Sequence, residues 1–276
     1  MLVLSPHCSL AHDRVGHLRG RHRHAAAEEL VRTRWVRRIS CRRGKSASSE
    51  GFCHDCAVQS RAFCAVLSNE ALTKLEGLHT LCDLAPEESL FMEGDRAASF
   101  FTVLNGCLRL SKLLPDGRRQ ITGFVLPGEF IGLSPGTTHA YNAEALVEAN
   151  LCRFALGDLE RISDENPAMK GRLLDMTNAN LARAQEHMLL LGRMTALEKI
   201  ASFLCNLIER ASAADLSHDP LILPMSRADI ADYLGLTIET VSRTFTRLKT
   251  DKLISLPEHN QVEVNDMPEL RRLAEG

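Results

Sequence analysis

The stretch that decides the fold of this chain reads Ser226-Arg-Ala-Asp-Ile-Ala-Asp-Tyr-Leu-Gly-Leu-Thr-Ile-Glu-Thr-Val-Ser-Arg243. Ser226, with Asp229 three residues later, has the pattern of a capping box at the start of a helix. Gly235 suits the left-handed residue that ends such a helix, and Thr237 is placed to cap a second one. The stretch therefore predicts a helix-turn-helix, a motif whose second helix enters the major groove of DNA.

The second helix is expected to have an apolar inner face and a polar outer face. Apolar residues recur at helical spacing on one side, namely Val241, Phe245 and Leu248. The polar residues that we expect to contact DNA are Glu239, Ser242, Arg243, Thr246 and Arg247. Arginine can bind guanine O6 and N7, and glutamate can accept a hydrogen bond from cytosine. Residues 253–256 and 261–264 predict a hairpin wing after this helix.

Length and charge indicate two domains and a local DNA contact. The 276 residues exceed the usual size of one domain. The net charge is −2, but residues 1–50 hold eleven Lys and Arg against four Asp and Glu, which leaves about −9 for the remainder. DNA binding is therefore expected from a local basic face. Because no signal peptide or membrane-spanning run is visible, a cytoplasmic protein without membrane contact is expected.

The first part of the chain divides into two segments. Residues 1–50 are rich in Arg and His without apolar periodicity, which predicts a disordered basic tail. A translation start nearer residue 50, or an arm that binds phosphates, are the alternatives. Within residues 51–165, strand-like runs at 100–104, 108–113 and 121–126 alternate with turn signals spaced about 8–12 residues apart. This rhythm predicts a small antiparallel barrel or jelly roll.

A heptad pattern predicts a dimerisation helix in residues 166–194. Its seam positions are Leu174, Thr177, Leu181, Ala184, Met188 and Leu191. A second copy of the same helix is the expected partner, and packing on the chain's own barrel is the alternative. Residues 195–276 complete a winged helix-turn-helix domain, so the predicted fold class is α+β.

Nine cysteines point to metal or redox chemistry. Their number is odd and no export signal is present, which argues against a disulfide framework. Cys53 and Cys56 form a C-x2-C pair, and Cys64 follows. Three thiolates are an incomplete ligand set, since a [4Fe–4S] cluster takes four. Tetrahedral zinc with a fourth cysteine, or three unligated thiols, remain open.

These motifs together resemble the FNR branch of the CRP/FNR transcription regulators, in particular its FNR- and FixK-type proteins. The resemblance covers about residues 52–272. It rests on the cysteine trio, Gln120-Ile-Thr-Gly-Phe124, Cys152, Met188-Leu-Leu-Leu191 and the run from Leu234 to Arg243.

The resemblance implies a cofactor, partners and a mechanism. The implied ligands of a [4Fe–4S] cluster are Cys53, Cys56, Cys64 and Cys152, with Cys82 and Cys107 as alternatives for the fourth. Glu239, Ser242 and Arg243 would read a TTGAT-type half-site. The protein would be an oxygen-responsive activator that acts on RNA polymerase. The cluster would hold the dimer helix so that two recognition helices lie about 34 Å apart on palindromic DNA, and oxygen would release the DNA.

The sequence favours three other functions less than this one. A cyclic-nucleotide regulator would use Gly128 and Glu129 with a later arginine, but residues 137–141 contain no basic residue to pair with the phosphate. We therefore interpret Gly128 and Glu129 as structural. Outside the family, the cysteines would make the chain a zinc or electron-transfer module. No P-loop, nucleophile elbow or dinucleotide fingerprint is present, so an enzyme is not expected.

Overall fold

The computed structural model describes residues 40–42, 51–134, 136–212 and 220–276. The segment Ile39–Gly276 forms one compact unit, and the description below concerns it alone. The predicted disordered tail lies outside the described residues except at Ser40–Arg42. There the prediction was wrong, because these residues form strand β1 and pair antiparallel with β2 (Thr80–Leu84). The backbone of β2 would otherwise lie unpaired at the sheet edge, which favours this addition.

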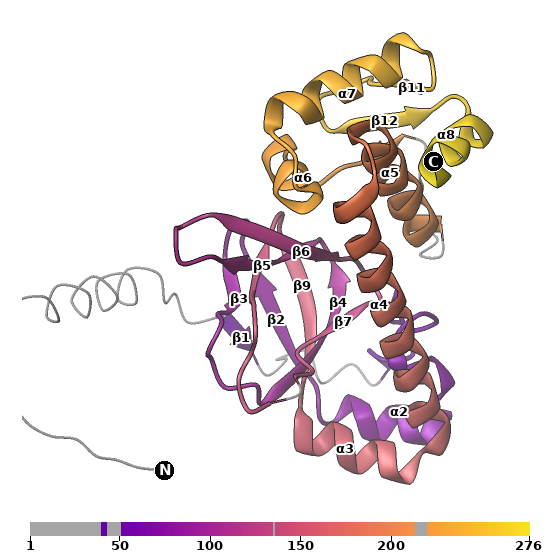
Figure 1. Ribbon diagram of the computed structural model, residues 1–276. Coiled ribbons are helices and arrows are strands. Elements are labelled where there is room, and N and C mark those ends of the chain that lie inside the picture. Colours follow the sequence, from indigo (N-terminus) through magenta and orange to yellow (C-terminus); the bar gives the residue numbers. More distant parts are fainter. Residues whose placement is uncertain (1–39, 43–50, 135, 213–219) are drawn as a thin grey trace, which may run out of the picture. The chain divides into compact units, whose positions relative to one another are not determined.

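Two antiparallel sheets form a β-roll (Figure 1). The first sheet has the order β1-β2-β9-β4-β7, with β9 at Ala149–Ala155, β4 at Ser99–Asn105 and β7 at Phe130–Ile131. The second has the order β3-β8-β5-β6, with β3 at Ser89–Phe91, β8 at Asn142–Ala145, β5 at Leu108–Leu113 and β6 at Arg119–Val125. The predicted antiparallel domain is confirmed, and its three expected strands are β4, β5 and β6.

The core of the roll lies between the inner faces of the sheets. Leu84, Leu108 and Leu151 are each no more than 1 % exposed, and burial of such a side chain stabilises the fold by roughly 1.5–3 kcal/mol. The predicted turn at Asn105-Gly106 connects β4 to β5. Gly106 has a φ of 87°, and a Cβ there would lie 2.5 Å from the carbonyl oxygen of Glu148, so only glycine fits this turn.

Helices surround one end of the roll and then lead away from it. A 3₁₀ turn, η1 (Phe63–Val66), and helix α2 (Asn69–Glu76) precede the strands. Helix α3 (Leu156–Glu165) follows β9, and α4 (Pro167–Arg193) then runs past the roll toward α5 (Figure 1). The long helix predicted over residues 166–194 is confirmed as α4. No described helix is long and apolar enough to cross a membrane.

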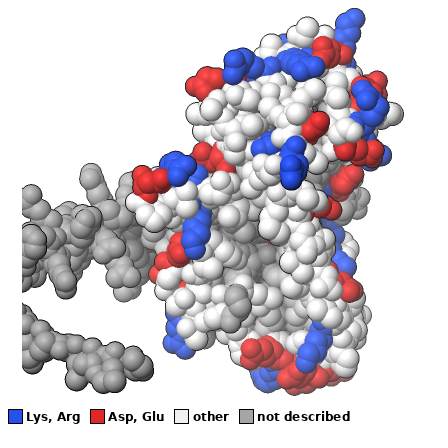
Figure 2. Space-filling view, in the orientation of Figure 1, with Lys and Arg blue, Asp and Glu red and all other residues white. Residues whose placement is uncertain are grey.

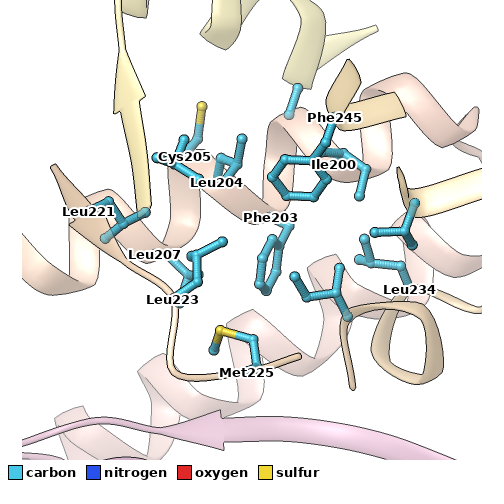
Figure 3. Packing of buried hydrophobic residues seen from close by; sticks show 14 of the residues in the cluster. Ile200, Phe203, Leu204, Cys205, Leu207, Leu221, Leu223, Met225, Leu234 and Phe245 are labelled. Atoms are coloured by element: carbon cyan, nitrogen blue, oxygen red, sulfur yellow. The ribbon is translucent and has the colours of Figure 1, made fainter. Parts of the chain in front are cut away.

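The last domain is a winged helix-turn-helix. It consists of α5 (Ala196–Ser212), β10 (Leu221–Ile222), α6 (Arg227–Leu234), α7 (Ile238–Thr250), β11 (Ile254–Ser255), β12 (Gln261–Val264) and α8 (Met267–Glu275). The predicted wing is confirmed as β11 and β12, which β10 extends to three strands. Figure 3 shows Phe203, Leu234 and Phe245 around a common apolar centre between α5, α6 and α7.

A buried ionic network joins the roll to α6. The Oδ1 atom of Asp229 accepts hydrogen bonds from Arg109 at 3.1 Å and from Arg119 at 2.9 Å. Arg119 also donates to Asp232 at 2.9 Å. Asp229 itself completes the predicted capping box, because its Oδ2 accepts from the backbone N–H of Ser226 at 3.0 Å. One carboxylate thus starts α6 and binds two arginines of the roll.

The Gln120–Phe124 motif lies at this same joint. The side-chain amide of Gln120 donates to the carbonyl oxygen of Asp232 at 2.7 Å. The carbonyl oxygen of Phe124 accepts from Arg210 of α5 at 2.6 Å. Arg210 also donates to both carboxylate oxygens of Glu129, at 3.1 and 2.6 Å. Strand β6 and the turn after it therefore contact α5 and α6 through polar groups.

Removal of the Asp229 carboxylate should destabilise the fold more than removal of the Asp232 carboxylate. Asp229→Ala loses a helix cap and leaves the buried Arg109 guanidinium without its interdomain partner, so we expect a loss of about 3 kcal/mol or more. Asp232→Ala is the matched control, because its pair with Arg119 is partly solvated and worth about 1 kcal/mol or less. Urea denaturation measures both variants, and equal losses would contradict the role given to Asp229.

The stabilities of the wild type and of Asp229→Ala should respond differently to acid. Burial alone would raise the pKa of Asp229, but hydrogen bonds from Ser226 and the charges of Arg109 and Arg119 hold it below its ordinary value. A carboxylate with a lowered pKa stabilises the fold fully above about pH 4, and this contribution is lost as pH falls further. The stability gap between the wild type and Asp229→Ala should therefore shrink below about pH 4.

Candidate cysteine centre and nucleic-acid interface

Backbone turns fold the cysteine segment against the roll. The amides of His54 and Asp55 donate to the carbonyl oxygen of Gly51, at 3.0 and 2.9 Å. A further turn follows, in which the amide of Ala62 donates to Val58 at 3.0 Å. This turn leads directly into η1, which carries Cys64. The segment is thus compact over the whole stretch that contains the three predicted thiol ligands.

The structure brings the four predicted cysteine ligands together. Cys53, Cys64 and Cys152 are buried in one apolar cluster with Phe63 and other aromatic side chains. Cys56 is half-buried and is near enough to Cys53, Cys64 and Cys152 to raise the pKa of each. Cys152 lies within β9, opposite Leu81 on one side and Thr102 on the other, rather than at the end of the strand. The four residues therefore come from the N-terminal segment and the centre of a sheet.

The thiols affect one another electrostatically. Burial raises the pKa of Cys53 to about 12, with further contributions from Glu76, Cys64 and Cys56. Burial raises the pKa of Cys64 to about 11, and Cys56 adds to this shift. Burial also raises the pKa of Cys152 well above its ordinary value, and the other three cysteines raise it further. Without a cation, Cys53, Cys64 and Cys152 are thus held neutral, and a bound metal would favour their ionised form.

The donor set fits a cluster in its chemistry. A [4Fe–4S] cluster takes four cysteine thiolates, and four cysteines are available here. Among the described residues, however, no three His, Cys, Asp or Glu side chains are already arranged to hold a metal ion. Binding would therefore need the thiols to move closer together.

The other described cysteines lie apart from this group. Cys107 and Cys205 are free and belong to a separate core cluster, which includes the winged-helix domain. Cys82 is disulfide-bonded and packs in the core of the roll, whereas the sequence argued against a framework of disulfides. The geometry therefore favours Cys152 over Cys82 and Cys107 as a fourth ligand, and its role stays a prediction.

The predicted DNA-contacting residues all lie on the solvent side of α7. Glu239, Ser242, Arg243, Thr246 and Arg247 are exposed, whereas Val241, Phe245 and Leu248 are buried. The Thr237 hydroxyl accepts from the amide of Thr240 at 3.2 Å, as the predicted cap requires. Gly235 has the predicted left-handed conformation, with a φ of 62°. Figure 2 shows basic and acidic side chains mixed over the described surface in view.

Glu239 is held as an acceptor at the start of this helix. Its own backbone N–H lowers its pKa, and the Thr237 hydroxyl and the charge of Arg243 lower it further. An ionised carboxylate can only accept hydrogen bonds, which suits contact with an amino group on a base edge. The arrangement therefore provides an acceptor in Glu239 and a donor in Arg243 within one turn of the helix.

One residue that fixes the orientation of α7 was missed in the sequence. The guanidinium of Arg227 lies over the ring of Phe245, 3.5 Å from its centroid. Such a contact adds roughly 0.5–2 kcal/mol and joins α6 to α7. Arg227 follows the cap residue Ser226, but the sequence gives no signal of its partner 18 positions later.

The outer face of α4 is apolar and exposed on the single chain. Leu174, Leu181 and Met188 are 60 %, 57 % and 63 % exposed. Thr177 and Ala184, the other seam positions between them, are exposed as well. Leu191 differs, because it is half-buried and packs near Gly235 of the helix-turn-helix. At Leu191, contact within the chain thus competes with the predicted contact to a second copy.

A β-roll followed by a long helix and a winged helix-turn-helix defines a class of DNA-binding regulators. The model of the Crp-like helix-turn-helix domain matches residues 198–273, and that of the cyclic nucleotide-binding domain matches residues 81–166. The nitrogen fixation regulation protein FixK of Bradyrhizobium diazoefficiens is 43 % identical over 223 residues, which cover 81 % of this chain and 94 % of that protein.

Two further similarities agree with this one. The transcriptional activator protein FnrL of Cereibacter sphaeroides is 38 % identical over 222 residues, covering 79 % of this chain and 90 % of FnrL. The structure of FixK2 from Bradyrhizobium japonicum superposes with a TM-score of 0.67 at 36 % identity, covering 71 % of this chain and 97 % of FixK2. The chain belongs to the CRP/FNR family of transcription regulators. The predicted resemblance is thereby confirmed, and the chain is a regulator rather than an enzyme.

Leu181→Glu should weaken self-association. The substitution places a carboxylate in the middle of the exposed apolar seam, where a second copy would bury it. We expect the dimer dissociation constant to rise by at least about tenfold. Leu189→Glu is the matched control, because Leu189 is 65 % exposed but lies outside the seam. Sedimentation equilibrium measures both, and an unchanged dissociation constant for Leu181→Glu would place the interface elsewhere.

Proposed function

We propose that this regulator is an oxygen- or redox-responsive activator that binds a palindromic promoter site as a homodimer. The ligands of its [4Fe–4S] cluster would be Cys53, Cys56, Cys64 and Cys152. The observation that carries the proposal is that three of these thiols, those of Cys53, Cys64 and Cys152, share one apolar cluster with the inner face of α4. A thiolate-bound cluster would supply a centre whose stability and redox state depend on its surroundings.

Helix α4 contacts the cysteine segment with one face and exposes the seam on the other. Met169 is fully buried in the same cluster as Cys53, Cys64 and Cys152. One turn further along α4, Arg172 donates to the carbonyl oxygen of Arg61 at 3.0 Å. Leu174 follows on the opposite, exposed face.

A displacement of the cysteine segment therefore acts on the same turn of α4 that begins the seam. Coupling between two such sites typically amounts to about 1–3 kcal/mol. That range is enough to alter a dimerisation equilibrium by one or two orders of magnitude.

The exposed face of α7 would read the DNA. In the dimer, two such helices would enter successive major grooves about 34 Å apart. Glu239, Ser242 and Arg243 would contact a TTGAT-type half-site, while Thr246 and Arg247 would contact the same strand or its phosphates. RNA polymerase is the proposed partner at the promoter, since the similar protein FnrL is a transcriptional activator by name. The proposed location is the cytoplasm.

A cluster-free regulator is the second candidate, and three observations favour it. The thiols are not preassembled for a metal, and the cyclic nucleotide-binding domain model matches the roll. A cavity of about 530 Å³ also lies between the roll and helices α4 and α5, lined by Glu129, Arg183 and Arg210 among others. Both carboxylate oxygens of Glu129 already bind Arg210, however. A ribose would have to displace this ion pair, so the cyclic-nucleotide function is less favoured.

Cys152→Ser should abolish cluster binding. The hydroxyl replaces one of four sulfur donors, so protein purified without oxygen should lose iron, acid-labile sulfide and visible absorption together. Cys205→Ser serves as the control, since Cys205 is a buried free cysteine of the winged-helix domain. A full iron content in Cys152→Ser would exclude this residue as a ligand. A colourless wild type with bound zinc would replace the cluster by a zinc site.

Arg243→Ala should relax sequence preference at one half-site position. The loss of a bidentate contact to guanine should cost about 1–3 kcal/mol on the specific site and much less on other DNA. Arg247→Ala is expected to weaken binding to all sequences about equally, because a phosphate contact carries no base information. Titrations with specific and scrambled duplexes at fixed salt separate the two effects. A uniform loss for Arg243→Ala would make it a phosphate contact.

A further inference from the structure

The end of α2 holds the segment that carries Cys53. The Oε1 atom of Glu76 accepts hydrogen bonds from the backbone amides of Phe52 at 2.9 Å and Gly51 at 3.3 Å. The ring of Phe52 stacks on His79, with the centroids 5.0 Å apart and the planes inclined by 11°. The backbone immediately before Cys53 is thus fixed by the carboxylate of the last residue of α2 and by the ring of His79, which follows this helix.

Glu76 is unusual for its position in the helix. It is the last residue of α2, where the negative end of the helix dipole disfavours a carboxylate. Among the residues that the structure describes, no cation pairs with it, whereas Glu70 on the same helix pairs with Lys74 at 3.1 Å. Its hydrogen bonds go to the cysteine segment, and it is near enough to Cys53 to raise the pKa of that thiol, after the larger effect of burial. The stability of α2 therefore does not explain why a glutamate occupies this position.

We propose that Glu76 is a positioning residue of the cysteine centre. It fixes the turn that contains Cys53, and so determines where this thiol lies relative to Cys152 and the others. This inference rests on the proposed function, because a cluster is what the positioned thiols would hold. Glu76 is not itself a ligand of the cysteine centre. It acts through its hydrogen bonds to the backbone amides of Gly51 and Phe52.

Two substitutions separate the effect of the hydrogen bonds that Glu76 accepts from the effect of its negative charge. Glu76→Gln keeps an oxygen that can accept from both amides but removes the negative charge, whereas Glu76→Ala removes both. Supporting groups around a metal site typically alter its affinity by about 10–100-fold. Glu76→Ala should therefore lose iron to a chelator about tenfold faster than the wild type. Glu76→Gln should retain iron nearly as well, and the reduction potential of its centre should rise because a negative charge has gone. Glu70→Ala is the control on the same helix.

Amide hydrogen exchange on the full-length, metal-free protein supplies a readout that needs no cluster. The informative amides are those of His54 and Asp55, which bind Gly51 and do not touch Glu76. Their exchange should accelerate in Glu76→Ala and stay near the wild-type rate in Glu76→Gln and Glu70→Ala. Unchanged exchange in Glu76→Ala would overturn the inference whether or not a cluster is present. Accelerated exchange with unchanged iron loss would overturn it as well. If the wild type binds no iron, the proposed function is rejected, but the role of Glu76 is not. The exchange rates of the metal-free protein then test that role by themselves.

Discussion

The carboxylate of Asp229, buried between Arg109 and Arg119, is the interaction on which the joint between the two domains depends. Buried charges are costly to desolvate, and this cost is offset only where geometry and hydrogen bonding are good. Here the same carboxylate caps α6, so the roll and the helix-turn-helix share one group. Arg227 then connects α6 to α7 through Phe245. The orientation of the DNA-reading helix relative to the roll therefore follows from these polar contacts together with the packing of Phe124 against Phe203 and Tyr233.

Helix α4 is the element through which the N-terminal centre can reach the DNA-binding half. Its inner face shares an apolar cluster with three of the four cysteines, and its outer face leaves Leu174, Leu181 and Met188 in solvent. Helix α4 runs without interruption for 27 residues, from the turn that contacts the cysteine segment to the start of the DNA-binding half. The cysteine segment thus contacts one face of α4, while Leu174, Leu181 and Met188 lie on another face of the same helix.

Features that are local in sequence could be predicted, and those that join distant segments could not. The caps at Ser226 and Thr237 and the left-handed Gly235 follow from residues within one turn of each other, so the sequence was sufficient. The pair of Arg109 with Asp229 spans 120 positions, and no periodicity indicates which arginine meets which carboxylate. Strand β1 was missed for the same reason, because its partner β2 lies about 40 residues away. The half-burial of Leu191 depends on the helix-turn-helix folding back against it.

The central claim is that the state of the cysteine centre determines whether two copies associate along α4. Sedimentation equilibrium of one anaerobic sample, with iron measured before and after air is admitted, tests it most directly. The account predicts that the dimer dissociation constant rises as iron is lost, by about ten- to a hundredfold for a coupling of this size. A dissociation constant that is the same with full iron and with none would contradict it.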